Sequence, residues 1–199
     1  METPKIHSIW SLSAITLLLT LTLRATLFPD KSSQVLCMSG WLIYQIIDAI
    51  ILFKFKEASP TPRATILHHM VVATASAIAI FITPSVRGLL IEYSWIEINA
   101  WFYYLRKLLY PWNAKLLKIF YYISVLVFRH LVCPYMTYKI AARLSEGVCL
   151  QMIFVMSLCM NFLHLWWLFL LLKNRVSQRT FNLMAFIDTI RKGNACKAM

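Results

Sequence analysis

Six apolar stretches, each close to the length of a membrane-spanning helix, are the feature that most constrains how this chain folds. They cover residues 9–28, 35–53, 64–82, 89–109, 116–138 and 148–172. A helix needs about 20 mostly apolar residues to cross a bilayer, and short polar or proline-containing breaks separate the six stretches. The sequence therefore predicts an all-α, polytopic membrane protein with six transmembrane helices.

The composition excludes the soluble classes of protein. Hydrophobic residues make up 60% of the 199-residue chain and charged residues only 14%, with a mean hydropathy of +0.65. Soluble domains carry about 45–50% apolar and about 25% charged residues, so neither a water-soluble enzyme nor a disordered chain fits. The five cysteines include no C-x-x-C pair, which argues against a zinc cluster or a disulfide framework.

The basic residues predict the orientation of the helices. The formal net charge is +12, which in a soluble protein would suggest nucleic-acid binding. Six spans place both termini on one side, and fourteen of the twenty Lys and Arg residues fall on that side against four on the other. Because cytosolic loops carry the excess of Lys and Arg, both termini are expected to be cytosolic, and no nucleic-acid partner is expected.

The two ends of the chain suggest a domain division. Residues 1–34 hold the first span and its loop, 35–172 the five further spans, and 173–199 a basic cytosolic tail. The first span is expected to be retained rather than cleaved as a signal peptide, since no small-x-small site follows it. The basic tail with interspersed apolar residues suits a helix on an anionic leaflet.

Ionisable and amide side chains inside the apolar stretches are the candidate site residues, because such groups are costly at membrane depth unless they face the bundle interior or water. These residues are Arg24, Asp48, His68, His69, Glu92, Glu97, Asn99, Arg129, His130, Asn161 and His164. Several of them are expected to converge on one internal cavity between the midplane and the cytosolic face.

The adjacent His68 and His69 carry the most chemistry. A neutral imidazole can act as a general base or nucleophile near neutral pH, and neighbours on a helix point about 100° apart, so one ring can face a cavity while the other bonds a neighbouring helix. On spacing alone, helix packing with both rings bonded to neighbouring helices is the slightly favoured explanation of the pair. A di-iron centre would need several H-x-x-H boxes, and a single pair among five histidines predicts no metal site.

The remaining polar residues also have both a functional and a structural explanation. Asp48 and Glu97 suit the role of carboxylates that orient a catalytic histidine, although a charge pair with Arg129 or Arg24 would account for them as well. The side chains of Asn161 and His164 share a helix face, where both would line a cavity or form interhelical hydrogen bonds.

The order of these motifs resembles the TLC-domain family, which includes ceramide synthases, translocating-chain-associating membrane proteins and small TLC-domain proteins. The matching elements are Tyr44-x-x-x-Asp48, Leu67-His68-His69, Glu92-x-Ser94 followed by Asn99-x-Trp101-Phe102, Arg129, and Asn161 followed by Trp166. The resemblance spans about residues 35–172. It implies a six-helix bundle around a central cavity that holds a long-chain lipid.

The resemblance also implies roles for the residues. One of His68 and His69 would be the acyl-accepting nucleophile or general base and the other its support. Asp48 and Glu97, as carboxylates able to orient a histidine, complete the predicted catalytic set. The remaining polar residues would line the lipid cavity: Glu92, Ser94, Asn99, Arg129, Asn161 and His164. Ceramide synthases carry a His-Asp-x-x-Asp cluster where this chain has residues 92–97, Glu-Tyr-Ser-Trp-Ile-Glu, so the small TLC-domain proteins are the closer pattern.

Three functions are compatible with this sequence. The first is acyl transfer from acyl-CoA, the only co-substrate expected, to a sphingoid or lysolipid acceptor in the endoplasmic reticulum membrane. The second is a non-enzymatic sensor or regulator of membrane lipid composition, and the third is a chaperone-like membrane protein. The sequence predicts neither a resident cofactor nor an oligomeric state.

The predicted topology is testable with accessibility tags. Glycosylation or cysteine-labelling tags placed beside Arg87 and beside Lys192 should report opposite sides of the membrane, because five loops and a tail alternate between the two faces. Tags that report the same side would contradict the six-span arrangement.

Overall fold

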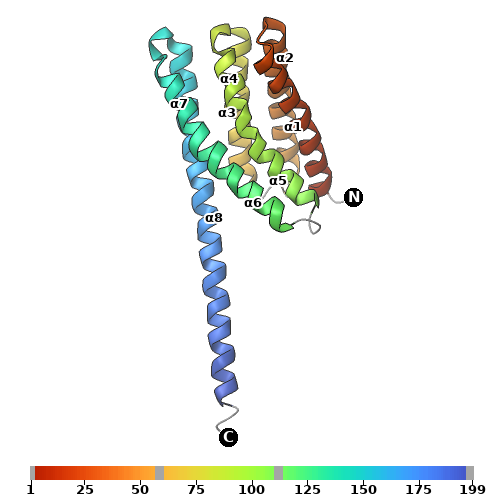
Figure 1. Cartoon of the computed structure of the whole chain (residues 1–199), viewed down its shortest axis with the longest axis vertical. Helices are drawn as coiled ribbons and strands as arrows, with labels where there is room; N and C mark the ends of the chain where they lie inside the picture. The colour runs from red at the N-terminus through yellow and green to blue at the C-terminus, as the bar shows by residue number, and fades with distance from the viewer. Residues whose placement is uncertain (1–2, 57–60, 110–113, 196–199) are drawn as a thin grey trace. The chain divides into compact units, whose positions relative to one another are not determined.

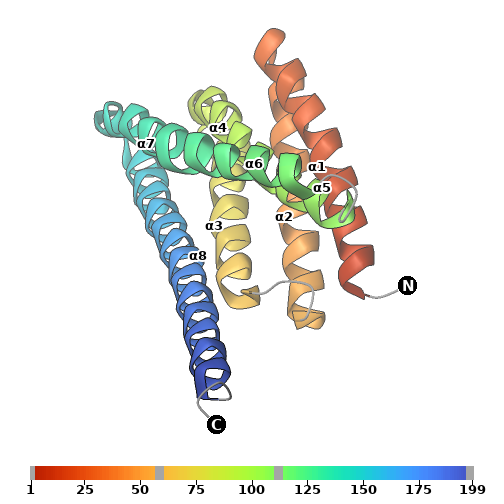
Figure 2. The ribbon, with the colours of Figure 1, turned by 60° about the horizontal axis from the view of Figure 1, so that its bottom comes forward.

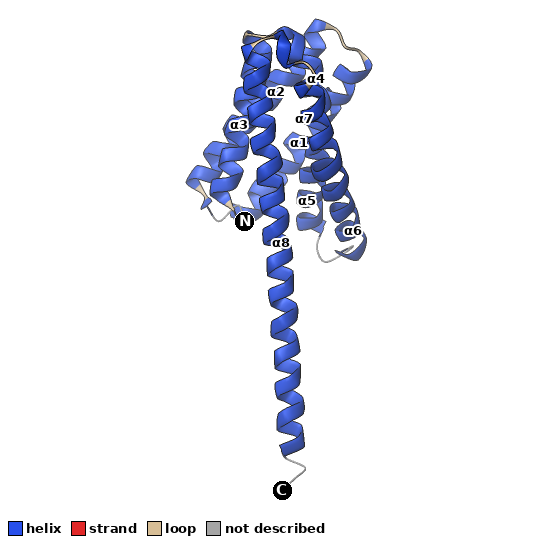
Figure 3. Ribbon diagram, turned by 90° about the vertical axis from the view of Figure 1, so that its left-hand side faces the viewer, coloured by secondary structure: helices blue, strands red, loops and turns tan. Residues whose placement is uncertain are grey.

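The computed structural model describes residues 3–56, 61–109 and 114–195 of the chain. Within these ranges every regular element is a helix and no strand occurs, as the colouring of Figure 3 makes plain. The chain divides into two compact units, residues 1–163 and 164–199. The predicted all-α class is confirmed.

Three long helices open the first unit: α1 (Thr3–Leu27), α2 (Lys31–Lys54) and α3 (Pro62–Phe81). Helix α2 packs against both of the others, and α1 and α2 form an antiparallel hairpin (Figure 1). Asp30 caps α2 by accepting a hydrogen bond from the Ser33 amide at 2.9 Å, which satisfies one of the unpaired donors of the first turn. Hydrogen bonds from nearby hydroxyls and this amide lower the pKa of the Asp30 carboxyl.

The predicted span 89–109 is a broken helix rather than a continuous one. After the short η2 turn (Pro84–Val86), the chain forms α4 (Arg87–Ser94), a 3₁₀ turn η3 (Trp95–Glu97) and α5 (Ile98–Leu109). A 3₁₀ turn winds the backbone more tightly than an α-helix, so it changes the angular direction of the side chains that follow. The break falls at a residue of the predicted site, Glu97.

The predicted span 116–138 contains a π-helical segment. Helix α6 (Ala114–Ser124) passes through η4 (Val125–Val132), whose turns are π-helical, into α7 (Cys133–Ala141). Pro134 has no amide hydrogen and its ring crowds the preceding turn, and a wider π-turn relieves that crowding. Together α6, η4 and α7 form a continuous rod that is inclined to the first three helices (Figure 2).

The last helix, α8, runs from Val148 to Ala195 and belongs to both units. It follows a 3₁₀ turn, η5 (Leu144–Glu146), and Gly147. Arg143 and Glu146 form a two-pronged ion pair at this turn, with N–O distances of 2.5 and 2.6 Å. The pair raises the pKa of Arg143 and lowers that of Glu146. In the second unit, the rings of Trp166 and Phe169 lie 5.9 Å apart.

Five helical segments among the described residues are long and apolar enough to cross a bilayer. They are Lys5–Leu27, Lys31–Lys54, Pro62–Phe81, Lys115–Ala141 and Val148–Leu170. The predicted span 89–109 is not one of them, because it is divided into shorter helices. The segment nevertheless runs between the same two ends of the first unit as its neighbours (Figure 1). The chain is a multi-pass integral membrane protein.

Burial in the first unit follows the pattern expected of a membrane bundle. Large apolar side chains are exposed, with Phe53 at 72% and Phe81 at 76%. Polar side chains occupy the interior, where Asp48, Gln45 and Ser11 are fully buried. Lipid solvates the apolar exterior, whereas each buried polar group requires a partner inside the protein. The polar groups therefore determine how the helices pair.

Basic residues gather at one end of the first unit. Figure 1 places the start of α1, the end of α2, the start of α3, the end of α5 and the start of α6 at that end, and the α1–α2, α3–α4 and α7–α8 connections at the other. The described basic residues at or near the first end are Lys5, Lys54, Lys56, Arg63, Arg106, Lys107, Lys115 and Lys118; those at or near the second are Arg24, Lys31, Arg87, Lys139 and Arg143. That the more basic end faces the cytosol stays a prediction.

Gly147 offers a test of the turn before α8. Its φ of 136° and ψ of 175° lie in a region that only glycine adopts readily, and a Cβ there would meet nothing within 4 Å. Gly147→Ala should therefore lower the free energy of unfolding by about 1–3 kcal/mol through backbone strain alone. Gly88→Ala is the matched control, since its Cβ also meets open space within helix α4. Reversible unfolding in mixed micelles measures both, and equal stability of the two variants would contradict the strain.

Candidate functional site

A cavity of about 50 Å³ lies inside the first unit. Its walls come from α2, α3, α4, η3, α7 and the first part of α8. Most of the lining is apolar, and the polar side chains in it are His68, Ser76, Tyr93, Ser94, Glu97 and Ser157. A pocket with a few polar groups set in apolar walls is typical of a site for a small ligand or for part of a larger one.

His68 and Glu97 form the charged part of the cavity wall. The Nε2 atom of His68 on α3 lies 3.3 Å from Oε1 of Glu97 on η3, and their side chains are 7% and 13% exposed. Arg129 of η4 interacts electrostatically with Glu97, so the carboxylate has a cationic neighbour besides the imidazole. A histidine held by a carboxylate is the arrangement that orients a general base.

His69 faces away from this pair, toward α2. Its Nε2 atom lies 2.8 Å from Oδ2 of Asp48, and its Nδ1 atom contacts Oε1 of Gln45. The rings of His68 and His69 lie 5.3 Å apart at 72°. Because adjacent helical residues point about 100° apart, the two histidines serve different neighbours: one lines the cavity and the other joins α3 to α2.

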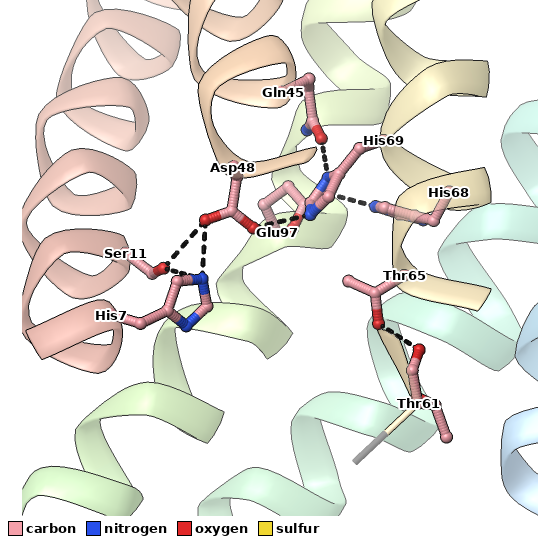
Figure 4. A network of polar contacts seen from close by, with 9 residues as sticks. All are labelled: His7, Ser11, Gln45, Asp48, Thr61, Thr65, His68, His69 and Glu97. Carbon is pink, nitrogen blue, oxygen red and sulfur yellow. Dashed lines mark hydrogen bonds and ion pairs between the residues drawn. The ribbon is translucent and has the colours of Figure 1, made fainter. Parts of the chain in front are cut away.

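His7 of α1 completes the buried cluster around Asp48. Its Nε2 atom lies 2.9 Å from Oδ1 of Asp48, and the Ser11 hydroxyl donates to the same oxygen at 3.3 Å. Figure 4 shows His7 and His69 approaching the carboxylate from opposite sides. Three helices thus meet at one carboxylate. Ser11 and Asp48 both contact Nε2 of His7, so the three residues lack the two-nitrogen arrangement of a serine-protease triad.

Of the predicted cavity residues, Ser94 shares the cavity wall with the histidine and carboxylate pair, whereas two others take partners elsewhere. Glu92 forms an exposed ion pair with Lys139 of α7. The Asn99 amide donates to the Ser124 hydroxyl at 3.0 Å and thereby connects α5 to α6.

Asn161 and His164 fall on opposite sides of the division between the two units. The Asn161 amide donates to the Thr137 hydroxyl at 2.7 Å, and that hydroxyl lies 2.5 Å from Ser157, which lines the cavity. Asn161 therefore stands behind the cavity wall. In the second unit, the His164 ring lies 5.9 Å from that of Trp167.

The sequence does not predict two residues of the buried cluster around Asp48, His7 and Gln45. His7 precedes the first apolar stretch by two residues, so a search for ionisable groups inside the spans does not reach it. The available signal was its spacing of four from Ser11, which places both on one helix face. Gln45 is uncharged, but it lies three residues before Asp48 on the same face of α2.

Among the residues described, no group of three or more His, Cys, Asp and Glu side chains has metal-binding geometry.

Comparisons of the chain with protein-family models, with curated proteins and with solved structures return no match. The residues themselves therefore have to supply the functional inference. Their arrangement separates two parts: a cavity with His68 and Glu97 in its wall, and a buried cluster of Asp48 with His7 and His69 behind it. The first part lines the cavity, and the second joins α1, α2 and α3.

Removal of the Asp48 carboxylate is expected to lower the free energy of unfolding substantially. Asp48→Ala removes the only carboxylate that either His7 or His69 contacts among the described residues, and breaking such a buried pair costs about 3–5 kcal/mol. Glu92→Gln is the control, because its partner Lys139 and the pair itself are exposed and such pairs contribute at most about 1 kcal/mol. Unfolding titrations in mixed micelles should separate the two variants clearly; an equal loss would contradict a structural role for the cluster.

Proposed function

We propose that this chain is a lipid-binding membrane protein of the TLC-domain type that transfers a fatty acyl group from acyl-CoA to a sphingoid or lysolipid acceptor. The observation that supports the proposal is the pairing of His68 with Glu97 in the wall of a mainly apolar cavity. The apolar lining suits part of an acyl chain, and the imidazole supplies a base at the same place. The ordered motifs that resemble the TLC-domain family point in the same direction.

Geometry favours His68 over His69 as the reactive histidine. Both ring nitrogens of His69 are occupied, one by Asp48 and the other by Gln45, and His69 does not line the cavity. The Glu97 carboxylate beside His68 also has Arg129 as a cationic neighbour. That guanidinium balances the carboxylate, so His68 need not be charged and can act as a neutral base.

In the proposed reaction, His68 removes the proton from the amine or hydroxyl of the acceptor as that atom attacks the thioester carbonyl carbon. A new C–N or C–O bond forms and the C–S bond of acyl-CoA breaks. The proton on His68 then passes to the leaving thiolate, which departs as a thiol. Glu97 stabilises the transient imidazolium. A nucleophilic variant, in which His68 first accepts the acyl group, uses the same residues and predicts a covalent adduct.

The basic end of the first unit supports the choice of acyl-CoA. His68 lies six residues after the start of α3 at Pro62, which places it about 9 Å along the helix at 1.5 Å per residue. Arg63, Lys54 and Lys56 lie at that same end, where they would attract the phosphates of coenzyme A. A cytosolic position of this end, in the endoplasmic reticulum membrane, is part of the proposal.

The size of the cavity favours a second function, lipid sensing without turnover. A volume of about 50 Å³ accommodates a few atoms, so a whole lipid requires the helices to separate. A protein that binds the end of a chain and responds to membrane composition needs no larger space. In that case His68 and Glu97 would contribute hydrogen bonds to the cavity wall rather than chemistry.

The experiment combines mass spectrometry with a turnover assay. Purified protein in nanodiscs is supplied with long-chain acyl-CoA and either a sphingoid base or a lysolipid, and products, co-purified lipid and any acyl adduct are measured. His68→Ala should lower turnover by at least about 100-fold, the contribution of a general base, and should abolish any adduct. The control is His130→Ala, since His130 is not part of the cavity wall.

The two functions give different outcomes. Acyl transfer is supported if His68→Ala loses turnover while the folded protein and its co-purified lipid remain. A double variant, His68→Ala with His69→Ala, that keeps wild-type turnover contradicts the mechanism. A wild-type protein that turns over neither acceptor but loses lipid on His68→Ala substitution supports the sensor instead.

A further inference from the structure

The Asp48 cluster consists of His7, Ser11, Gln45, Asp48 and His69, and it lies outside the cavity wall. We propose that this cluster is a buried proton-binding site, in which His69 carries the bound proton as an imidazolium at neutral pH and His7 stays neutral. The proposal does not depend on acyl transfer, because none of these residues touches the cavity.

The partners of His69 indicate two N–H donors. Nε2 faces a carboxylate oxygen of Asp48 at 2.8 Å, and Nδ1 faces the amide oxygen of Gln45. Each oxygen is a hydrogen-bond acceptor, and a neutral imidazole has only one N–H to donate. A neutral ring would set an unprotonated nitrogen against one of these two oxygens, whereas the imidazolium donates to Gln45 from Nδ1 and forms an ion pair with Asp48 at Nε2. The environment of the ring therefore favours the imidazolium.

The partners of His7 indicate the opposite protonation state. Its Nε2 atom lies 2.9 Å from Asp48, whereas Nδ1 is buried and has no hydrogen-bond partner within the described part of the chain. A proton on Nδ1 would leave a buried donor unpaired, which is costly. His7 therefore donates from Nε2 as a neutral ring. One Asp48 oxygen accepts from His7 and from the Ser11 hydroxyl at 3.3 Å, and the other lies 2.8 Å from Nε2 of His69 as an ion pair.

Charge balance supports the same assignment. The Asp48 carboxylate and one imidazolium sum to zero, whereas two neutral histidines would leave a net negative charge buried among membrane helices. The uncharged hydroxyls of Tyr44 and Tyr104 also interact with Asp48. They supply no compensating cation, so that cation has to come from a histidine.

The remaining charged neighbours leave this balance unchanged. Glu97 also interacts with His69, but it contacts His68 and interacts with Arg129, so its charge has cationic and polar partners of its own. Lys5 lies on α1 but is exposed at the end of the helix. The bound proton therefore belongs to the Asp48 cluster, where it allows one carboxylate to hold α1, α2 and α3 together.

Histidine nitrogen NMR tests this site directly. The full chain, labelled with ¹⁵N-histidine, is reconstituted in phosphatidylcholine nanodiscs at pH 7, and the His69 signals are assigned by their loss in His69→Gln. A free imidazole is about one-quarter protonated at this pH. We expect more than about nine-tenths of His69 to be doubly protonated, with His7 neutral.

Two variants and a control complete the test. Asp48→Asn removes the counter-charge, and Gln45→Met removes the acceptor at Nδ1 while keeping a side chain of similar length; each should lower the doubly protonated fraction of His69 to about one-quarter or less. His130→Gln, outside the cluster, should leave it unchanged. The wild-type spectrum alone is decisive even if Asp48→Asn does not fold. A neutral His69 in the wild type, as expected if the Gln45 amide turned its nitrogen toward the ring, would overturn the proposal, as would an imidazolium that persists in a folded Asp48→Asn protein.

Discussion

A single buried carboxylate, Asp48, determines how the first three helices pair. In a bilayer an unpaired carboxylate is very costly, and water is not available to solvate it. His7 approaches one oxygen from α1 and His69 approaches the other from α3. The contacts that neutralise the carboxylate are therefore the same contacts that hold the three helices together. A second contact, from the Trp41 indole to the Thr22 hydroxyl at 3.0 Å, joins α1 to α2 nearer the turn between them.

Local departures from the α-helix shape the cavity that lies beside this cluster. The 3₁₀ turn η3 contains Glu97, and the π-helical segment η4 contains Arg129. Both segments change the angular position of a side chain relative to a regular helix. As a result Glu97 lies in the cavity wall near His68 and in electrostatic range of Arg129. The positions of these charges depend on the irregular backbone, which is a common feature of functional sites in helical proteins.

The sequence predicts the helices far better than it predicts the contacts between them. Apolar length and proline-containing breaks suffice to locate the long helices, because each depends on nearby residues alone. The turn at Trp95–Glu97 has no glycine or proline to reveal it, and Pro134 predicts a disturbance but not its π-helical form. The sequence does not predict the role of His7, because its partner Asp48 lies 41 residues away. A contact between two helices depends on how they pack, and the sequence of one helix does not determine that packing.

The two adjacent histidines show how neighbouring residues acquire different chemistry. Both are buried on α3, and their rings lie 5.3 Å apart. His68 shares its carboxylate with an arginine, which already balances the charge of Glu97. No arginine or lysine ion pair to Asp48 occurs within the described residues, so a histidine has to supply the compensating charge there. The two rings therefore differ in whether their carboxylate has another cation nearby. The carboxylate beside His68 has Arg129, so His68 is suited to take up a proton. The carboxylate beside His69 has no arginine or lysine ion pair among the described residues, so His69 is suited to keep one.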